Sequence, residues 1–234
     1  MSFDECALAY DRQLRRGLRL SGEGPEWFAR QRVAFVAKHL GQTGHSPNII
    51  LEFGCGTGNH VPFLRTAFQD CTIVGVDVSS ESLRVARQRH AGDDIRFYTP
   101  TEFDEPQSVD LVFVNGVFHH IPPAEHDRWL AYLARLLRPG GSAAIFDNSP
   151  FNPGARLVMR LIPFDRDAVM VNPYRFRKQM AEYGFASPRL RFHFIFPRVL
   201  SVLRPVEQAL ARWPIGAQFG LIAEKLGQGW SQPF

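Results

Sequence analysis

The segment NIILEFGCGTGN, which runs from Asn48 to Asn59, constrains the fold of this chain more than any other stretch. It consists of an apolar run, then Glu52, then glycines on alternate positions at Gly54, Gly56 and Gly58. Glycine adopts positive φ without a steric cost and lets a ligand approach the backbone closely. The pattern therefore predicts a buried strand that ends in a tight turn around a ligand.

Apolar runs and helical patterns alternate around this turn. Apolar residues at helical spacing fill residues 25–40, and strand-like runs and amphipathic helices then follow each other up to residue 147. Such alternation is typical of an α/β domain whose parallel sheet is covered on both faces. The tail departs from it, with a helix expected at 172–185, a strand at 189–196 and a closing strand at 217–225.

Asp77 indicates what the turn binds. It ends the next expected strand, nineteen residues beyond Gly58, where a carboxylate can accept hydrogen bonds from both hydroxyls of a ribose. A dinucleotide fingerprint would need a third glycine at Asn59 or Val61, and neither position has one. Glu52 would repel a pyrophosphate and would suit a cationic ligand such as an ammonium or a sulfonium. We therefore expect a nucleoside-bearing cofactor, and an NAD-dependent oxidoreductase is the less favoured enzyme class.

Four motifs, in order along the chain, resemble those of class I S-adenosylmethionine-dependent methyltransferases. LEFGCGTG is similar to the first motif of that family, acid-x-G-x-G-x-G, and DLVFVNGVFHHIP, LLRPGGSAAIFD and AQFGLIAEK are similar to its fourth, fifth and seventh strands. The resemblance covers most of the chain. It implies an α/β fold with a Rossmann-like, doubly wound seven-stranded sheet in the order 3-2-1-4-5-7-6, the last strand antiparallel.

The resemblance also implies that S-adenosylmethionine is the cofactor and S-adenosylhomocysteine the product. Asp77 would hold the ribose and Val78 the adenine, while Asn115 and Gly116 would lie near the sulfonium. The full set of implied cofactor-binding residues is Glu52, Gly54, Gly56, Gly58, Asp77, Val78, Asn115 and Gly116, with Tyr10 as a further contact from an N-terminal lid.

The chain departs from the family pattern at the adenine amino group. Many members place an acid after the third strand, but here the stretch is YTPTEF. Thr99, Thr101, Glu102 or a backbone group would have to substitute, so this contact stays open.

His119 and His120 are the candidates for a catalytic base, because they follow the fourth expected strand, close to where the methyl group should lie. A neutral imidazole can take a proton from a hydroxyl or a carbon acid; the alternative is that this pair only packs against its loop. Asp147 and Asn148 end the fifth strand, as in metal-dependent catechol-type O-methyltransferases, but Asn115 stands where those enzymes carry an aspartate. Since magnesium prefers carboxylate-rich sites, we expect no metal.

We expect a helical lid over residues 1–46 and a methyltransferase domain over residues 47–234. A plain packing helix is the alternative to the lid. Residues of about 149–172 are expected to form the acceptor pocket from apolar, aromatic and basic side chains, namely Phe151, Met159, Phe164, Met170, Arg156, Arg160 and Arg166. A small-molecule acceptor of aromatic, anionic or amphiphilic character is expected, methylated on oxygen or carbon, since no Asn-Pro-Pro-Tyr-like motif follows the fourth strand. The non-enzyme alternative is a partner subunit that binds the cofactor without transfer.

Charge is unevenly distributed along the chain. The net charge is +4, and from Phe151 onward 12 Lys and Arg residues stand against 5 Asp and Glu. No dense basic block or nucleic-acid motif occurs, so nucleic acid is not an expected partner. A helical insertion at about 197–214 has an apolar face flanked by Arg198, Arg204 and Arg212. It predicts either weak contact with a membrane surface or a cap over an amphiphilic acceptor, and a helix packed on the core is the alternative.

Composition also suggests a cellular location. No apolar run approaches the roughly 20 residues that span a bilayer, and the first residues include early acids and no apolar core of a signal peptide. The three cysteines are odd in number and lack metal-ligand spacing. These features suit a reducing compartment, so we expect a cytoplasmic protein.

Overall fold

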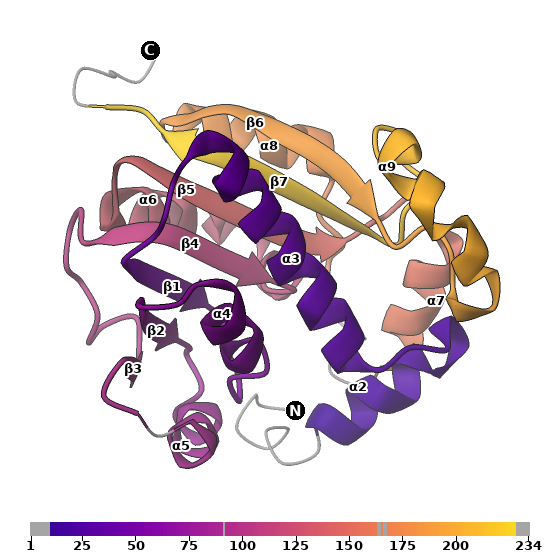
Figure 1. The fold of residues 1–234 in the computed structure, drawn as a ribbon, viewed down its shortest axis with the longest axis horizontal. Coiled ribbons are helices and arrows are strands. Elements are labelled where there is room, and N and C mark those ends of the chain that lie inside the picture. The colour runs from indigo at the N-terminus through magenta and orange to yellow at the C-terminus, as the bar shows by residue number, and fades with distance from the viewer. Residues whose placement is uncertain (1–9, 91, 163–164, 166–167, 228–234) are drawn as a thin grey trace.

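One sheet of seven strands organises the residues that the computed structural model describes, which are 10–90, 92–162, 165 and 168–227 (Figure 1). The strand order is β3-β2-β1-β4-β5-β7-β6. β7 runs antiparallel to its neighbours β5 and β6, and the other neighbouring strands pair in parallel. This confirms the predicted Rossmann-like sheet, in strand order and in strand direction. The strands are β1 (Ile49–Phe53), β2 (Thr72–Val76), β3 (Ile95–Tyr98), β4 (Val109–Asn115), β5 (Leu137–Asn148), β6 (Phe185–His193) and β7 (Gln218–Lys225).

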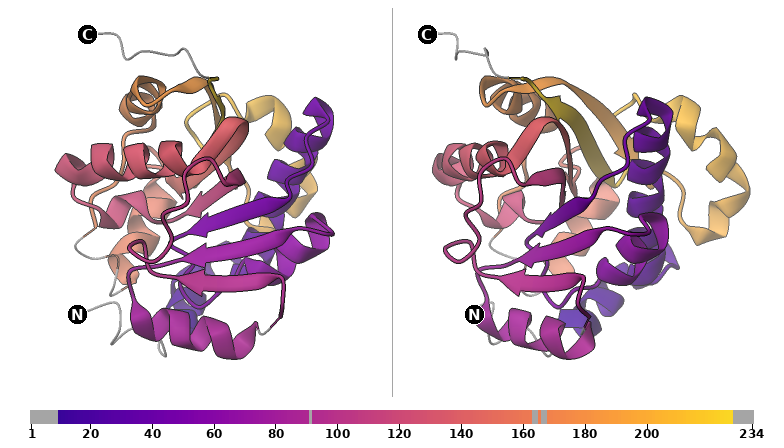
Figure 2. Two further views of the ribbon diagram at one scale, coloured as in Figure 1. Left: turned by 90° about the vertical axis from the view of Figure 1, so that its left-hand side faces the viewer. Right: turned by 60° about the vertical axis from the view of Figure 1, so that its left-hand side comes forward.

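Helices cover both faces of the sheet, as the two views of Figure 2 show. On one face, α3 (Pro25–Thr43), α4 (Val61–Ala67) and α5 (Ser80–Arg89) share a hydrophobic cluster with the sheet. On the other face, α6 (His126–Leu136) and α8 (Pro173–Glu182) share a second cluster. The apolar spacing of three and four residues that predicted these helices supplies their buried sides. Among the described residues, no helix combines the length and the apolar composition that crossing a membrane requires.

Several short elements lie away from the sheet layers, at the right of Figure 1. They are α2 (Tyr10–Leu18), η1 (Arg19–Ser21), α7 (Pro153–Leu161), η5 (Arg198–Val206) and α9 (Glu207–Leu210). An ion pair of 2.8 Å between Arg204 and Glu23 joins η5 to the N-terminal segment. Elements from three distant parts of the chain are therefore assembled on one side of the sheet.

The carboxyl ends of β1, β2, β4 and β5 meet at one edge of the sheet, because these strands run parallel. Phe53 at the end of β1 is paired with Val76 of β2 and with Val114 of β4. The helix α4 that follows β1 covers one face of the sheet, and the helix α6 that follows β4 covers the other. Successive strands are therefore added in opposite directions on the two sides of the β1–β4 pair, which makes this pair the point where the strand order reverses. Ligands of open α/β sheets bind at such a point, beyond the strand ends.

Candidate functional site

The glycine-rich turn after β1 leaves part of its backbone open. Gly54, Gly56 and Gly58 adopt φ values of 71°, 53° and 79°, in the left-handed region that favours glycine. A Cβ on Gly54 would lie 2.2 Å from Cγ2 of Val117, whereas a Cβ on Gly56 would meet no atom within 4 Å. Gly54 is therefore required by packing as well as by φ, and Gly56 presents a free stretch of backbone on which a ligand can lie.

Asp77 connects this turn to the end of β2. Its Oδ2 accepts a hydrogen bond of 2.8 Å from the backbone N–H of Gly56, and its Oδ1 accepts one of 2.9 Å from that of Ser79. The next residue, Val78, has an exposed fraction of 61%. The carboxylate thus lies beside the turn, and an apolar surface lies next to the carboxylate.

Two buried oxygens near the turn have no hydrogen-bond partner. Oε1 of Glu52 pairs with Nδ1 of His60 at 2.8 Å, but Oε2 of Glu52 and Oδ1 of Asn115 are unpartnered in the part of the chain that the structure describes. Buried polar atoms of folded proteins are nearly always paired. Both oxygens therefore indicate where a bound ligand would present donors.

A cavity of about 370 Å³ lies beside these groups. Its polar end includes Gly54, Gly56, Asn115, Gly116 and both candidate histidines. Its other end, called the apolar end below, is formed in large part by Trp27, Phe28, Val158, Ile162, Phe194 and Phe196. The guanidinium groups of Arg32 and Arg204 lie over three of these rings. Four of the predicted cofactor-binding residues lie outside the lining of this cavity, namely Glu52, Gly58, Asp77 and Val78. The cavity therefore leads from the glycine-rich turn to a wall of aromatic and aliphatic side chains.

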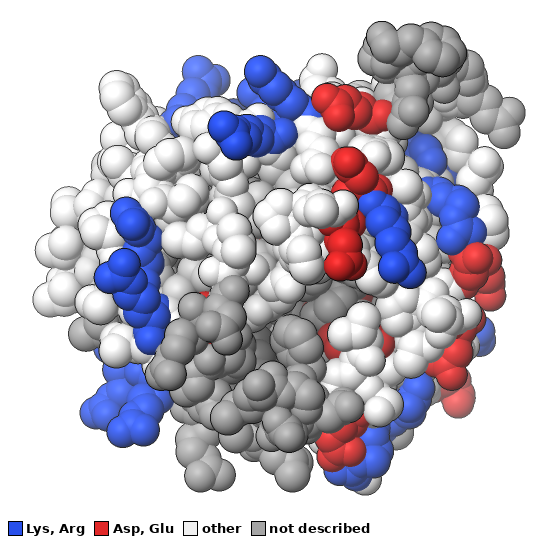
Figure 3. Space-filling view, turned by 180° about the vertical axis from the view of Figure 1, so that it is seen from behind, with Lys and Arg blue, Asp and Glu red and all other residues white. Residues whose placement is uncertain are grey.

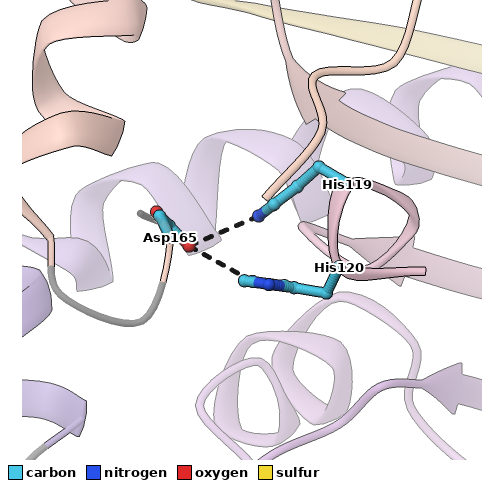
Figure 4. A group of neighbouring side chains, drawn as sticks. All are labelled: His119, His120 and Asp165. Atoms are coloured by element: carbon cyan, nitrogen blue, oxygen red, sulfur yellow. Dashed lines mark hydrogen bonds and ion pairs between the residues drawn. The ribbon is translucent and has the colours of Figure 1, made fainter. Parts of the chain in front are cut away.

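His119 and His120, in η2 (Phe118–His120), form a cluster with Asp165 at the polar end of the cavity (Figure 4). Oδ1 of Asp165 lies 3.4 Å from Nε2 of His119 and 3.2 Å from Nε2 of His120. On the other side of its ring, Nδ1 of His119 lies 2.5 Å from Oδ1 of Asp147. His119 is buried between two carboxylates, whereas the side chain of His120 has an exposed fraction of 15%.

The two carboxylates decide the protonation state of His119. Burial lowers the pKa of its imidazole, but the charge and hydrogen bond of Asp147, together with Asp165, outweigh burial and raise the pKa from 6.5 to about 10. For Asp165, burial raises the pKa, but the hydrogen bonds and the charges of His119 and His120 together lower it below its usual value. His119 is therefore a cation at neutral pH that cannot accept a proton, and Asp165 is an anion.

The same three side chains could in principle hold a cation. In the described part of the chain, His119, His120 and Asp165 offer ligand atoms that all lie within 4.8 Å of one another. Two imidazoles and a carboxylate are a ligand set that zinc and iron accept. Here, however, the side chains pair with one another directly, and the proton on His119 balances the charge of Asp147. That no metal takes part stays a prediction.

The segment predicted to form the acceptor pocket does line the cavity, but not through the side chains that the sequence suggested. Residues 149–172 do line the cavity, through Asn152, Gly154, Ala155, Val158, Ile162 and Asp165. Of the predicted pocket residues that the structure describes, none is in this lining; those are Phe151, Met159, Met170, Arg156 and Arg160. Phe164 and Arg166 lie outside the described residues, and so does the side chain of Tyr10, whose backbone begins α2.

Three polar residues of the site were missed from the sequence. Asp165 lies in the connection after α7 and has no motif around it. His60, two positions beyond Gly58, contacts Glu52 and lies 3.3 Å from Nη1 of Arg32. Arg32 is buried in α3, where its Nε donates to Oε1 of Gln218 at 2.8 Å. In the sequence, Arg32 could have been noticed as a site residue only because it is a polar residue within the apolar stripe of α3. His60 could have been noticed because it follows the glycine-rich turn directly.

Comparison with known proteins shows that the central part of the chain is similar to methyltransferases. Residues 51–143 match a family model described as a methyltransferase domain. The trans-aconitate 2-methyltransferase of Rhodopseudomonas palustris (strain BisB18) is 28% identical over 168 residues, covering 71% of this chain and 60% of that protein. The protein of the same name from Azoarcus sp. (strain BH72) is 34% identical over 119 residues, covering 49% and 44%. The chain thus spans 60% of the length of one of these relatives and 44% of the other.

Solved structures with little sequence identity share the architecture. The crystal structure of an S-adenosylmethionine-dependent methyltransferase from Archaeoglobus fulgidus matches with a TM-score of 0.60 at 13% identity, covering 82% of this chain and 94% of that one. At such an identity the similarity establishes the fold alone.

Proposed function

We propose that this chain, a class I S-adenosylmethionine-dependent methyltransferase by its sheet topology and by its methyltransferase-domain match, transfers a methyl group to oxygen or carbon of a small organic acceptor. The observation that carries the proposal is the buried Oε2 of Glu52, which has no partner among the described residues and lies in β1 two positions before the first glycine of the turn. An anionic acceptor of hydrogen bonds at the end of the first strand suits the ammonium of a methionine moiety.

The fit of the remaining residues supports the same cofactor. Oδ1 of Asn115 lacks a partner at the polar end of the cavity and can accept a hydrogen bond there. Asp77 would accept the ribose hydroxyls, and the exposed Val78 would lie against the adenine. When bound, S-adenosylmethionine supplies a methyl group already activated by its sulfonium, so that alignment of the acceptor provides much of the acceleration.

The charges of the histidine cluster favour His120 over His119 as the base. His119 already holds a proton at neutral pH and serves to position Asp165. Asp165, at 3.2 Å, would orient the ring of His120 and stabilise the cation that forms when His120 takes a proton. This arrangement of an imidazole with a buried carboxylate suits proton abstraction from a hydroxyl or a carbon acid.

The far end of the cavity favours an acceptor with an apolar part. Trp27, Phe28 and Phe194 lie there together, with ring centroids 4.8 to 5.6 Å apart. Arg32 and Arg204 also line the cavity, but each is already engaged, Arg32 by Gln218 and Arg204 by Glu23. We therefore infer an acceptor with an aromatic or aliphatic body. Trans-aconitate, named in the relatives, is the first comparison compound to assay.

Calorimetric titration with S-adenosylhomocysteine tests the cofactor. Wild-type protein should bind it, and Asp77→Asn should weaken binding by about 1.5–3 kcal/mol through the loss of charged hydrogen bonds. Asp104→Asn, which removes an exposed carboxylate that pairs with Arg135, is the matched control and should bind as wild type does. Binding of NAD in place of S-adenosylhomocysteine would overturn the proposal in favour of an oxidoreductase. Tight binding of S-adenosylhomocysteine without turnover of any acceptor would favour the partner-subunit alternative.

A further inference from the structure

Residues 198–215 present an apolar surface for which the proposed reaction has no use. Seven of the fourteen large apolar side chains that the described residues leave exposed lie on this 198–215 surface, namely Val199, Leu200, Val202, Leu203, Val206, Trp213 and Ile215. Val199 and Val202 have exposed fractions of 86% and 83%. Neither η5 nor α9 contains a buried residue. The apolar stripe predicted from the sequence therefore faces outward and is not packed on the sheet.

This exposure is fixed by contacts on the inner side of the segment. The guanidinium of Arg204 pairs with Glu23 and lies 4.3 Å from the ring centroid of Trp27. Glu207 accepts a hydrogen bond of 2.9 Å from the backbone N–H of Phe196. The right-hand view of Figure 2 shows η5 and α9 at the margin of the molecule, beyond α3. Because the polar side chains point inward and hold the segment, its apolar side chains are presented to the outside.

Positive charge accompanies the apolar side chains. Arg198 and Arg212 are exposed at the two ends of the surface, and Glu207, the acid between them, is engaged by the backbone of Phe196. Seen from behind, in Figure 3, Lys and Arg lie at the top, left and right of the molecule, and most Asp and Glu lie at the right among them. The exposed guanidinium groups of Arg198 and Arg212 would attract an anionic partner to the 198–215 surface.

We propose that the 198–215 surface binds the interface of an anionic lipid bilayer. Apolar side chains that enter the boundary between headgroups and acyl chains, with flanking Arg residues at the headgroups, are the pattern of interfacial protein segments. Trp213, with an exposed fraction of 65%, has the amphipathic ring that concentrates at such interfaces. A second copy of the same surface fits less well, because face-to-face contact would bring Arg residues together.

The 198–215 surface borders the cavity of the candidate site. Pro197 and Arg204 line that cavity from the same segment, so bilayer contact would bring the apolar end of the cavity close to the lipid. For an enzyme with the proposed function, and only if that proposal holds, an amphiphilic acceptor could then enter from the membrane. The bilayer contact itself does not depend on the reaction.

Vesicle binding of the full chain tests the proposal. Vesicles of phosphatidylcholine with roughly one-third phosphatidylglycerol should carry the protein down on sedimentation at low ionic strength, and about 0.5 M salt should release most of it. Trp213 emission should shift to shorter wavelength on binding, and Trp213→Phe should remove that shift. Vesicles of phosphatidylcholine alone should bind much less.

Three pairs of substitutions separate an effect of this surface from an effect of overall charge. Arg198→Gln with Arg212→Gln should weaken partitioning about 30-fold, since each Arg near the surface contributes roughly 1 kcal/mol. Arg175→Gln with Arg177→Gln changes the net charge equally at exposed positions of α8 and should have little effect. Val199→Ser with Val202→Ser should weaken partitioning roughly tenfold by removing apolar area.

The outcomes divide clearly. Loss of vesicle binding confined to the 198–215 variants supports the proposal. The proposal is overturned if the protein does not sediment with anionic vesicles, or if the α8 control loses as much vesicle binding as the 198–215 variants. It is also overturned if the protein binds no vesicles but self-associates, and the valine substitutions abolish that self-association. Titration of the same variants with S-adenosylhomocysteine is a separate readout, so a failure at the membrane is distinguishable from a failure of the proposed function.

Discussion

Raising the pH above neutrality should destabilise the protein through His119. The pKa of this imidazole, which would be near 6.5 in an unfolded chain, is about 10 in the folded one. Between these values the native state binds one proton more than the unfolded state, so stability falls as the pH rises. The contribution of His119 is complete below about pH 6.5 and lost above about pH 10, at roughly 1.4 kcal/mol per pH unit and on the order of 5 kcal/mol in all.

Urea denaturation at a series of pH values measures this loss, with an amide variant as the reference. His119→Gln combined with Asp147→Asn replaces the buried ion pair by two neutral groups of similar size, whereas removal of one partner alone would leave a buried charge at a cost of about 3–5 kcal/mol. Other groups that can titrate in this range, such as Lys225, whose pKa is lowered by burial, are present in both chains. The difference between the two unfolding free energies therefore reports on His119 together with the two carboxylates that contact it, Asp147 and Asp165.

The wild-type free energy of unfolding should decline more steeply than that of the double variant from about pH 7 to pH 10. Parallel curves would show that His119 gains no proton on folding and would refute the assignment of its charge. Nitrogen-15 NMR of the imidazole gives a direct check, because His119 should remain protonated near pH 8 while an exposed histidine is neutral there.

Three further outcomes are expected. His120→Gln should lower turnover by about 10²–10⁴ while the affinity for S-adenosylhomocysteine stays at its wild-type value, and full turnover would show that positioning alone suffices. Gly54→Ala should cost roughly 1–3 kcal/mol of stability, seen as a lower Tm, because its φ is 71° and its Cβ would meet Val117. Dialysis against a chelator should leave both turnover and Tm unchanged, and recovery of lost activity by zinc or iron would assign a metal to the cluster around Asp165.

The strand order of the sheet could be predicted because four motifs resemble those of class I methyltransferases, and that resemblance implied the order. Local signals alone predicted an α/β domain with a parallel sheet. Each strand end carries its own mark, the glycines after β1 and Asp77 after β2, and parallel pairing brings these marks to one edge. Asp165 could not be predicted, since it reaches His119 across 46 residues from a connection without a motif. The outward direction of Val199 and Val202 was equally hidden, because an apolar stripe reads the same whether it faces a core or the outside.

The two ends of the cavity are built by different parts of the chain. We therefore expect one end to determine the affinity for the cofactor and the other to determine the preference for the acceptor. The polar end consists of strand termini and the turns that follow them, whose positions depend on the hydrogen-bonded register of β1, β4 and β5. The apolar end is formed by the segments outside the sheet, through residues such as Trp27, Val158 and Phe196. Substitutions there can change the acceptor without disturbing the strand register that places the cofactor-binding groups. Acceptor preference should therefore follow the side chains of α3, α7 and the 194–197 segment, and cofactor affinity the residues at the strand ends.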